Sequence, residues 1–426
     1  MRGVVIALVL LGASAGQADS GAMEDPALAR ARKLLKETLL VDGHNDLPWA
    51  IREHAQAPRD VEAYDLRVAT PGDTDIERLR AGGVGAQFWS VYIPGEDKAL
   101  GYARVQLEQI DIARRVIAKY PEHLAVALSA SDVEREFARG RIASLLGMEG
   151  GHAIENSLGA LRTYYDLGVR YMTLTHGVTL DWADAAGDTA RHGGLTRFGE
   201  EVVREMNRLG MLVDLSHVTP ETMDDALRVS EAPVIFSHSS ARAVCDVPRN
   251  VPDAILKRLP ANGGVVMVTF VAAFVSQEFA DVAMPVWAEY KRRTAGVADP
   301  AERQRVYKEL SAAVEVPKVT IGQVADHIDH IRRVAGVDHV GIGGDYDGND
   351  RWPENLDDVS KYPHLFAELI RRGWTDADLE KLAGENLLRA FRSAEEVARR
   401  LQTARPPSTA TIEQLDGPAS PRPASH

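Results

Sequence analysis

Eight short apolar runs of β type alternate along the chain with stretches of helical periodicity, and this order restricts the fold more than any other feature. Strands that alternate with helices form a parallel sheet, and eight such units close into a barrel. We therefore expect an α/β fold, a (β/α)8 TIM-like barrel. In chain order the runs are residues 38–42, 85–93, 142–148, 171–175, 211–215, 234–237, 264–270 and 339–343.

The stretches between these runs carry helix signals. In residues 102–119 the apolar side chains of Val105, Ile112 and Val116 recur at helical spacing, as in a helix that packs on the outer wall of a barrel. Pro220 suits the first turn of a helix, and Gly210 suits a helix C-terminus. Further helices are predicted over 157–167, 196–209, 220–229, 252–259 and 321–334.

One segment, residues 271–319, interrupts the alternation between the seventh and eighth runs. It is polar and helix-prone and includes Trp287 and Tyr290. An insertion of this length is typical of a lid, a pocket wall or a dimer contact, and a helical pair on the surface is an equal alternative. We expect a single barrel domain over residues 24–398 that contains this helical insertion.

The two ends of the chain differ from the rest. Arg2, the apolar stretch 3–12 and the small residues 13–15 resemble a signal peptide of about residues 1–18, although a buried N-terminal strand fits the same stretch. We expect an exported protein, periplasmic or secreted. No later apolar run is long enough to span a bilayer. Residues 402–426, rich in Pro, Ala and Ser, predict a disordered tail without the apolar end of a GPI signal.

The composition argues against nucleic acid binding and excludes an internal disulfide. A formal net charge of −13 without a basic stripe argues against nucleic acid binding. Cys245 is the only cysteine, so no internal disulfide can form, and we expect its thiol to be buried and inert.

Three of the strand runs end in metal-ligating side chains. His44 and Asp46 follow the first run, and His217 and His238 end the fifth and sixth. Side chains two apart in an extended segment point the same way, so His44 and Asp46 can bind one ion together. Any one histidine could be a core or turn residue, but the shared context predicts a metal site at the C-terminal ends of the strands.

Two carboxylates end other runs at the same barrel level. Glu149, between glycines after the third run, can bridge two cations, although a helix-start role is the alternative. Asp345, after the eighth run, can take a proton from water and pass it to a leaving group. Asp347 is the alternative base. Asp345 could also have a purely structural role and stabilise a turn.

Two further side chains suit substrate binding. His176, which ends the fourth run, could be a fifth ligand or could donate a hydrogen bond to a carbonyl oxygen. Arg249 lies in a loop that Pro248 and Pro252 stiffen, so its guanidinium suits bidentate binding of a carboxylate, while an ordinary surface arginine is equally compatible.

Taken together, these residues resemble the renal or membrane dipeptidase family, metallopeptidase family M19 of the amidohydrolase superfamily. The resemblance runs from about residue 38 to 391, and its insertion at 271–319 looks like that of bacterial members. Val178 and Thr179 stand where animal members have Cys and Asn. The motifs that carry it are Asp42-Gly-His-Asn-Asp-Leu-Pro48, Gln87-Phe-Trp-Ser-Val-Tyr92, Gly147-Met-Glu-Gly-Gly-His152, Tyr171-Met-Thr-Leu-Thr-His176, Trp182-Ala-Asp184, Asp214-Leu-Ser-His217, Pro248-Arg-Asn250, the segment 341–348 and Gly384-Glu-Asn386.

The resemblance implies two Zn²⁺ per chain. His44 and Asp46 would hold the first, His217 and His238 the second, and Glu149 would bridge them. It also implies a role for His176 in polarising the carbonyl, for Arg249 in binding the terminal carboxylate, and for Asp345 in proton transfer.

The expected activity is hydrolysis of dipeptides, including those with a C-terminal D-residue, by a hydroxide that bridges the metals. The expected partners are small dipeptides and, in a homodimer, a second copy of the chain. A deaminase or lactonase on the same barrel is the alternative enzyme. A non-catalytic binding protein is the third hypothesis, but it would be expected to have lost a ligand or the proton-transfer residue.

Overall fold

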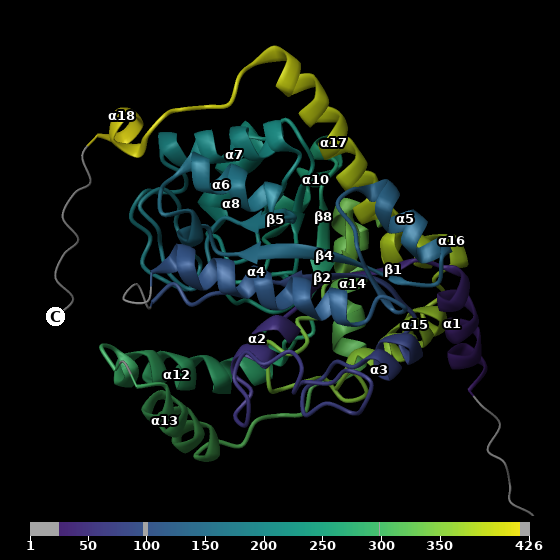
Figure 1. Ribbon diagram of the computed structural model, residues 1–426. Helices are drawn as coiled ribbons and strands as arrows, with labels where there is room; N and C mark the ends of the chain where they lie inside the picture. Colours follow the sequence, from purple (N-terminus) through teal and green to yellow (C-terminus); the bar gives the residue numbers. More distant parts are fainter. Residues whose placement is uncertain (1–24, 97–100, 298, 418–426) are drawn as a thin grey trace, which may run out of the picture.

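The computed structural model describes residues 25–96, 101–297 and 299–417, and its centre is a closed barrel of parallel strands surrounded by helices (Figure 1). The sheet order is β2-β1-β9-β8-β7-β6-β5-β4, and β2 pairs with β4 to close it. The predicted (β/α)8 barrel is therefore confirmed. The strands are β1 Leu40–Asn45, β2 Val84–Ser90, β3 Leu124–Val126, β4 Ile142–Glu149, β5 Val169–Thr173, β6 Leu212–Asp214, β7 Val234–Phe236, β8 Val265–Val268 and β9 Val340–Ile342.

The ninth strand, β3, lies outside the barrel and is absent from the sequence prediction. It pairs with the first half of β4, where Leu124 faces Ile142, while β5 pairs with the second half of β4 from Leu146 onward. With only three residues, one of them exposed, β3 has too short an apolar pattern to be recognised.

The predicted outer helices form at the expected places. α4 and α8 have the predicted bounds, and the predicted helix over 252–259 divides into two short ones, α9 and α10. The helices are α1 Pro26–Glu37, α2 Leu47–Arg52, α3 Ile76–Ala81, α4 Tyr102–Lys119, α5 Ala130–Ala138, α6 Leu158–Asp166, α7 Arg197–Leu209, α8 Pro220–Val229, α9 Asp253–Leu256, α10 Leu259–Asn262, α11 Ala272–Val275, α12 Gln277–Thr294, α13 Pro300–Ala312, α14 Ile321–Ala335, α15 Tyr362–Arg371, α16 Asp376–Glu380, α17 Asn386–Ala404 and α18 Ile412–Asp416.

Side-chain caps explain where these helices begin and end. The Thr219 hydroxyl accepts a hydrogen bond from Thr222 N at the start of α8, whose first residue is Pro220. Gly210 ends α7 in the left-handed conformation, with φ 84°. Such caps satisfy backbone groups that have no partner within the helix. The Thr219 cap lies in the loop after β6, at the barrel's open end, and Gly210 lies in the turn before β6, at the opposite end.

The segment 271–319 is helical, as predicted, and forms α11, α12 and α13. In Figure 1, α12 and α13 lie side by side at the lower left, away from the barrel wall. Lys291 Nζ donates a hydrogen bond to Gly187 O in the loop after β5, and the Tyr307 hydroxyl donates to Asp350 after β9. The pair is thus attached to two loops at the C-terminal end of the barrel.

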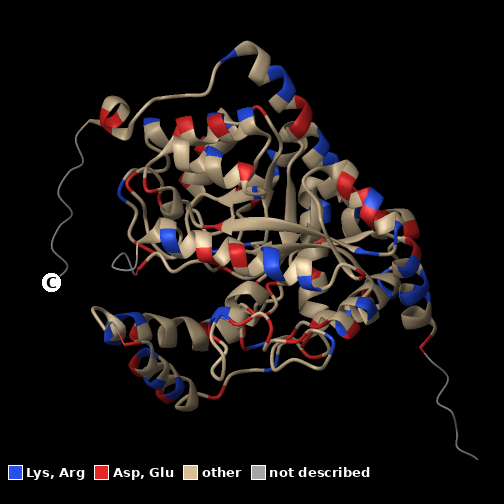
Figure 2. Cartoon of the chain, viewed as in Figure 1, with Lys and Arg blue, Asp and Glu red and all other residues tan. Residues whose placement is uncertain are grey.

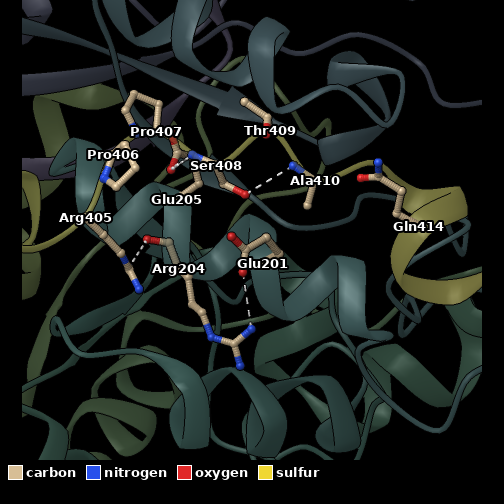
Figure 3. Close-up of a pocket in the computed structure, with 10 residues that line it drawn as sticks. All are labelled: Glu201, Arg204, Glu205, Arg405, Pro406, Pro407, Ser408, Thr409, Ala410 and Gln414. Carbon is tan, nitrogen blue, oxygen red and sulfur yellow. Dashed lines mark hydrogen bonds and ion pairs between the residues drawn. The ribbon is translucent and has the colours of Figure 1, made fainter.

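The C-terminal segment differs from the predicted disordered tail over residues 402–417. α17 continues to Ala404, Ser408 O accepts a hydrogen bond from Arg162 Nη1, and α18 places the Asp416 carboxylate at the start of α7. Figure 3 shows the pocket of about 450 Å³ between α7 and residues 405–410. Polar bonds to α6 and α7 thus hold a segment that has few apolar residues.

Residues 1–24 and 418–426, which include the predicted signal peptide and the end of the predicted tail, lie outside the described residues. Among the described helices, none combines the length and the apolar character needed to cross a membrane. Cys245 is fully buried, as expected, and burial raises the pKa of its thiol to about 12.

Candidate metal centre

The end of β1 contributes the first pair of ligating side chains. His44 is fully buried, and its Nε2 lies 3.2 Å from Asp46 Oδ2. Asp345, which follows β9, approaches the same nitrogen with its Oδ1 at 3.8 Å. β1 and β9 are neighbours in the sheet, and this pairing brings together His44 and Asp345, which are 301 positions apart in the sequence.

Glu149, the last residue of β4, lies between this pair and a second group. Its Oε2 is 3.5 Å from His44 Nε2, while its Oε1 is 2.9 Å from His217 Nε2 and 3.3 Å from His238 Nε2. The two oxygens of one buried carboxylate thus face two different sets of imidazoles. This is the arrangement that a bridging carboxylate requires.

His217 and His238 form the second group. Their Nε2 atoms are 2.8 Å apart, although they follow separate strands, β6 and β7. At this distance the two nitrogens share a hydrogen bond in the structure, and they are close enough to bind one ion together. The structure therefore brings together all five residues predicted as metal ligands: His44, Asp46, Glu149, His217 and His238.

Two of the site residues have a left-handed backbone that non-glycine residues seldom adopt. His217 has φ 69° and Asp345 has φ 68°. The backbone of His217 is held by Ala186 N and the Thr175 hydroxyl, which both donate to His217 O, and Asp345 N donates to His44 O. Such conformations cost about 1–3 kcal/mol each, and they cluster at functional sites.

Buried polar side chains that the sequence analysis did not select hold the ligating imidazoles. The Ser237 hydroxyl donates to Asp214 Oδ2 at 2.6 Å and lies 2.9 Å from His238 Nδ1. The Tyr171 hydroxyl lies 2.8 Å from His44 Nδ1. Fixing Nδ1 in this way turns Nε2 toward the site. One sequence signal for these supporting contacts was available: Asp214 is a carboxylate at the end of an apolar run.

Arg249 lies beside the second group and is 7 % exposed. Its Nη2 donates to His238 O at 3.1 Å and its Nη1 to the Ser239 hydroxyl at 3.3 Å, and the guanidinium lies over the Phe274 ring. Its buried Nε has no hydrogen-bond partner in the structure. The side chain is therefore part of the site and not an ordinary surface arginine.

His176 lies at the edge of the site, with its Nε2 3.9 Å from Glu149 Oε1. Its ring packs between those of Tyr92 and His217, at 4.8 and 4.4 Å between centroids. His176, Glu149 and His217 also form a group whose ligand atoms could hold one ion. The geometry thus keeps both expected roles of His176 open, but its side chain is more exposed than those of the five ligands.

Asp347, the alternative base, is placed differently. Its Oδ1 accepts a hydrogen bond from Asp73 N at 2.8 Å, and its own N donates to Asp73 Oδ2 at 2.9 Å. It joins no group of ligating atoms in the described residues. Asp345, and not Asp347, reaches the ligands.

Burial and neighbouring charges shift the pKa values of four groups in this cluster. Burial lowers the pKa of both His217 and His238 well below the usual range, which keeps them neutral, the form that binds a metal. Burial also raises the pKa of Asp345, and Asp46 and Glu149 raise it further. Burial alone would lower the pKa of His44, yet Tyr171, Glu149 and Asp46 outweigh it and raise that pKa.

These observations fit a metal pair. Among the residues that the structure describes, His44 Nε2 and Asp46 Oδ1 are buried without a hydrogen-bond partner. A Cβ at Gly348 would collide with the carboxylates of Asp46 and Asp345, so the glycine keeps space open there. Three imidazoles and two carboxylates without a thiolate suit a catalytic metal site rather than a closed structural one.

Comparison with known proteins agrees with this geometry. A family profile described as "Membrane dipeptidase (Peptidase family M19)" matches residues 28–405. Mouse Dipeptidase 3 is 43 % identical over 380 residues, which are 88 % of this chain and 68 % of the mouse protein.

Solved structures share the fold. The probable dipeptidase PvdM from Pseudomonas aeruginosa superposes with a TM-score of 0.76 at 24 % identity, over 87 % of this chain and 99 % of that one. A metallopeptidase from Rhodobacter sphaeroides, crystallised with a phosphinate mimic of the dipeptide L-Ala-D-Ala, gives 0.69 at 24 % identity, over 84 % and 99 %.

Proposed function

The chain belongs to the membrane dipeptidase family, peptidase family M19, and is a dipeptidase; we propose that it hydrolyses dipeptides with two zinc ions. The observation that carries the proposal is the position of Glu149, whose two carboxylate oxygens face His44 on one side and His217 with His238 on the other. His44 and Asp46 would hold one ion and His217 and His238 the other, with Glu149 shared.

Zinc in this site would supply Lewis acidity to the peptide carbonyl and to the attacking water. The chain's own groups do the rest. Asp345 Oδ1, close to the first ligand pair, takes the proton of the water and passes it to the departing amine.

His176 would donate a hydrogen bond to the carbonyl oxygen as negative charge develops there. Two features support this role over that of a fifth ligand. Its side chain is 23 % exposed, while those of Glu149 and His238 are nearly covered. The rings of Tyr92 and His217 hold it in place without a metal.

Arg249 would bind the free carboxylate of the dipeptide. Its Nη atoms are anchored on Ser239 and His238 O, so the guanidinium is preorganised, and its buried Nε is an unused donor. Recognition of this carboxylate would limit the substrate to one residue after the scissile bond, which excludes longer peptides.

The test is a double perturbation of this contact. Arg249→Ala, or a C-terminally amidated dipeptide with the wild type, should each lower kcat/KM by a factor corresponding to about 2–5 kcal/mol, as for loss of one partner of a buried charge pair. The two losses should not add, because either removes the same contact. Full additivity, or equal hydrolysis of amidated and free dipeptides by the wild type, would instead favour a broader amidohydrolase.

Metal content is measured on the same samples. The wild type should contain about two zinc ions per chain, and His217→Ala should lose mainly one of them together with nearly all activity. His54→Ala, a histidine outside the site, is the matched control. An active wild type with one ion or none would refute the dinuclear proposal.

A C-terminal D-residue is the finer part of the proposal. It is supported by the ligand of the Rhodobacter sphaeroides metallopeptidase, a mimic of L-Ala-D-Ala. Comparable kcat/KM values for L-Ala-D-Ala and L-Ala-L-Ala would support it, and a complete lack of L-Ala-D-Ala hydrolysis would contradict it.

Export to the periplasm or medium also stays a proposal, supported by the apolar residues 3–12 after Arg2. Homodimer formation and membership of a bacterial subgroup stay predictions. Fractionation of cells that express the full chain tests export, and light scattering of the purified protein tests homodimer formation.

A further inference from the structure

A second cavity, of about 730 Å³, lies at the opposite end of the barrel from the metal centre. It opens where β2 and β4 begin, and Val84 and Ile142 line it. Ile142 and Glu149 are the first and last residues of β4, so the cavity and the metal centre are about 23 Å apart at 3.3 Å per residue. Its volume falls within the usual range for small-molecule sites.

The rim of this cavity is cationic although the chain carries a net charge of −13. Its described lining residues include no Asp or Glu. Five of them are basic, and they come from α1, α3, the start of β4 and the turn 359–361. They are Arg32, Lys36, Arg80, Arg141 and Lys361. Figure 2 shows blue segments along α1 at the right-hand end of the molecule. The sequence could not reveal this cluster, because its members are up to 329 positions apart.

Most of this positive charge has no carboxylate partner nearby. Within the described part of the chain, Lys36, Arg80 and Lys361 form no ion pair with a carboxylate, and Arg80 Nη2 lies 2.6 Å from His123 Nδ1. Arg141 is paired with Glu136. The C-terminal ends of α1 and α3 stabilise Lys36 and Arg80, which belong to their last turns, and so allow the cluster to persist without a ligand.

The floor of the cavity is apolar. Leu35, Phe137, Ile142 and Pro363 line it, and Gly85 allows the Phe137 ring to lie against the strand, since a Cβ there would be 2.7 Å from that ring. The neighbouring His364 is affected by this positive charge: burial, Lys361 and Arg32 together lower its pKa. A concave apolar floor under a basic rim suits a small molecule with an apolar body and an anionic group better than an extended polyanion.

We propose that this cavity is a binding site for a small amphipathic anion, an aromatic or acyl group that carries a carboxylate, sulfonate or phosphate. The apolar body would lie on Phe137 and Ile142, and the anionic group would bind Lys36, Arg80 and Lys361. The site is separate from the metal centre and does not depend on the proposed catalytic roles.

The test titrates the metal-loaded full chain with two fluorescent probes, anilinonaphthalene sulfonate and its uncharged analogue phenylnaphthylamine. The double variant Lys36→Glu/Lys361→Glu is compared with Lys257→Glu/Lys308→Glu, which changes the net charge equally at exposed lysines outside the cavity. The first variant should weaken binding of the anionic probe by at least about tenfold, since two attractive charges become repulsive. The control should change it less than twofold.

Binding of the uncharged probe should be unaffected by either double variant, whereas Phe137→Ser should weaken the binding of both probes. Dipeptide hydrolysis should be unchanged by the charge variants, and circular dichroism confirms their folding. Should the glutamate variant fail to fold, Lys36→Gln/Lys361→Gln replaces it, with a smaller loss of the same kind expected.

Three results would overturn the proposal. Equal weakening by both double variants would mean that only the net charge matters. Displacement of the anionic probe by a dipeptide would place the probe in the metal centre. Binding of a short DNA duplex with the same sensitivity to Lys36 and Lys361 would show a polyanion surface instead.

Discussion

Asp345 combines a left-handed backbone, φ 68°, with a buried carboxylate near the metal ligands. Asparagine tolerates this backbone conformation well, so Asp345→Asn changes the charge with little change in conformation. Because general acid–base help is typically worth about 10²–10⁴-fold, kcat should fall by that factor while zinc content and thermal unfolding stay near wild type.

Asp347→Asn is the matched control, since Asp347 also has a positive φ but hydrogen-bonds Asp73. It should reduce kcat much less. A near-normal rate for Asp345→Asn together with a severe loss for Asp347→Asn would assign the proton transfer to Asp347.

Individual residues also show where sequence reasoning ends. The ligands could be located because each follows an apolar run, and position at a strand end is a property of sequence. Tyr171 and Ser237 could not be selected, because their role depends on contacts with His44 and His238 that only the closed barrel creates. Which histidine nitrogen faces the metal is decided by the same contacts.

At the scale of elements, His327 of α14 connects three segments. Ala241 N donates to its Nδ1 at 3.0 Å, and its Nε2 lies 2.9 Å from Val275 O, so only the neutral ring with a proton on Nε2 satisfies both. Burial lowers the pKa of His327 to about 4, from an ordinary value of 6.5. The unfolded chain therefore takes up a proton between pH 6.5 and 4 that the folded chain does not.

We accordingly expect His327 to lower the free energy of unfolding by up to about 3 kcal/mol as the pH falls through this window. His327→Gln should be less stable than wild type at pH 7 but should lose less on acidification, in denaturant unfolding followed from pH 7 to 4.5. His54→Gln is the control. An identical pH slope for His327→Gln and the wild type would disprove the assignment.

The C-terminal helix α18 supplies a cap to a distant element. Asp416 accepts hydrogen bonds from Thr196 Oγ1, Arg197 N and Phe198 N at the start of α7. Asp416→Ala should lower the free energy of unfolding by about 1 kcal/mol, as loss of an N-terminal cap and of a favourable charge at the helix dipole. Calorimetry of Asp416→Ala beside Glu413→Ala, on the same helix, measures this. Equal losses would mean that α18 acts only by packing.

The alternation of elements explains why the eight barrel strands could be predicted while the ends of the chain could not. Apolar runs have a direct sequence signal, whereas the order of residues 405–417 comes from single polar contacts such as Asp416 with α7 and Ser408 O with Arg162. Likewise, nothing in the local pattern shows that 271–319 is attached to loops at Gly187 and Asp350.

At the scale of the whole molecule, the metal centre connects the barrel wall across its open end. Its ligands lie at the C-terminal ends of β1 and β4 and just after β6 and β7, and Asp345 follows β9, so any ion bound there links most of the barrel strands. A cation would also relieve the mutual repulsion of Asp46, Glu149 and Asp345, which raises the pKa of Asp345. Metal binding is thus expected to stabilise the fold as well as to allow catalysis.

Removing the metals with a chelator should therefore lower the thermal unfolding temperature, and adding zinc should restore it. A ligand that binds only the folded state adds about 4 kcal/mol when present at 1,000 times its Kd. His217→Ala should show a smaller zinc-dependent shift than the wild type, because it keeps the first pair of ligands, His44 and Asp46. The control His54→Ala should show the full shift. If zinc raised the unfolding temperature of His217→Ala as much as that of the wild type, the stabilising ions would lie elsewhere in the protein.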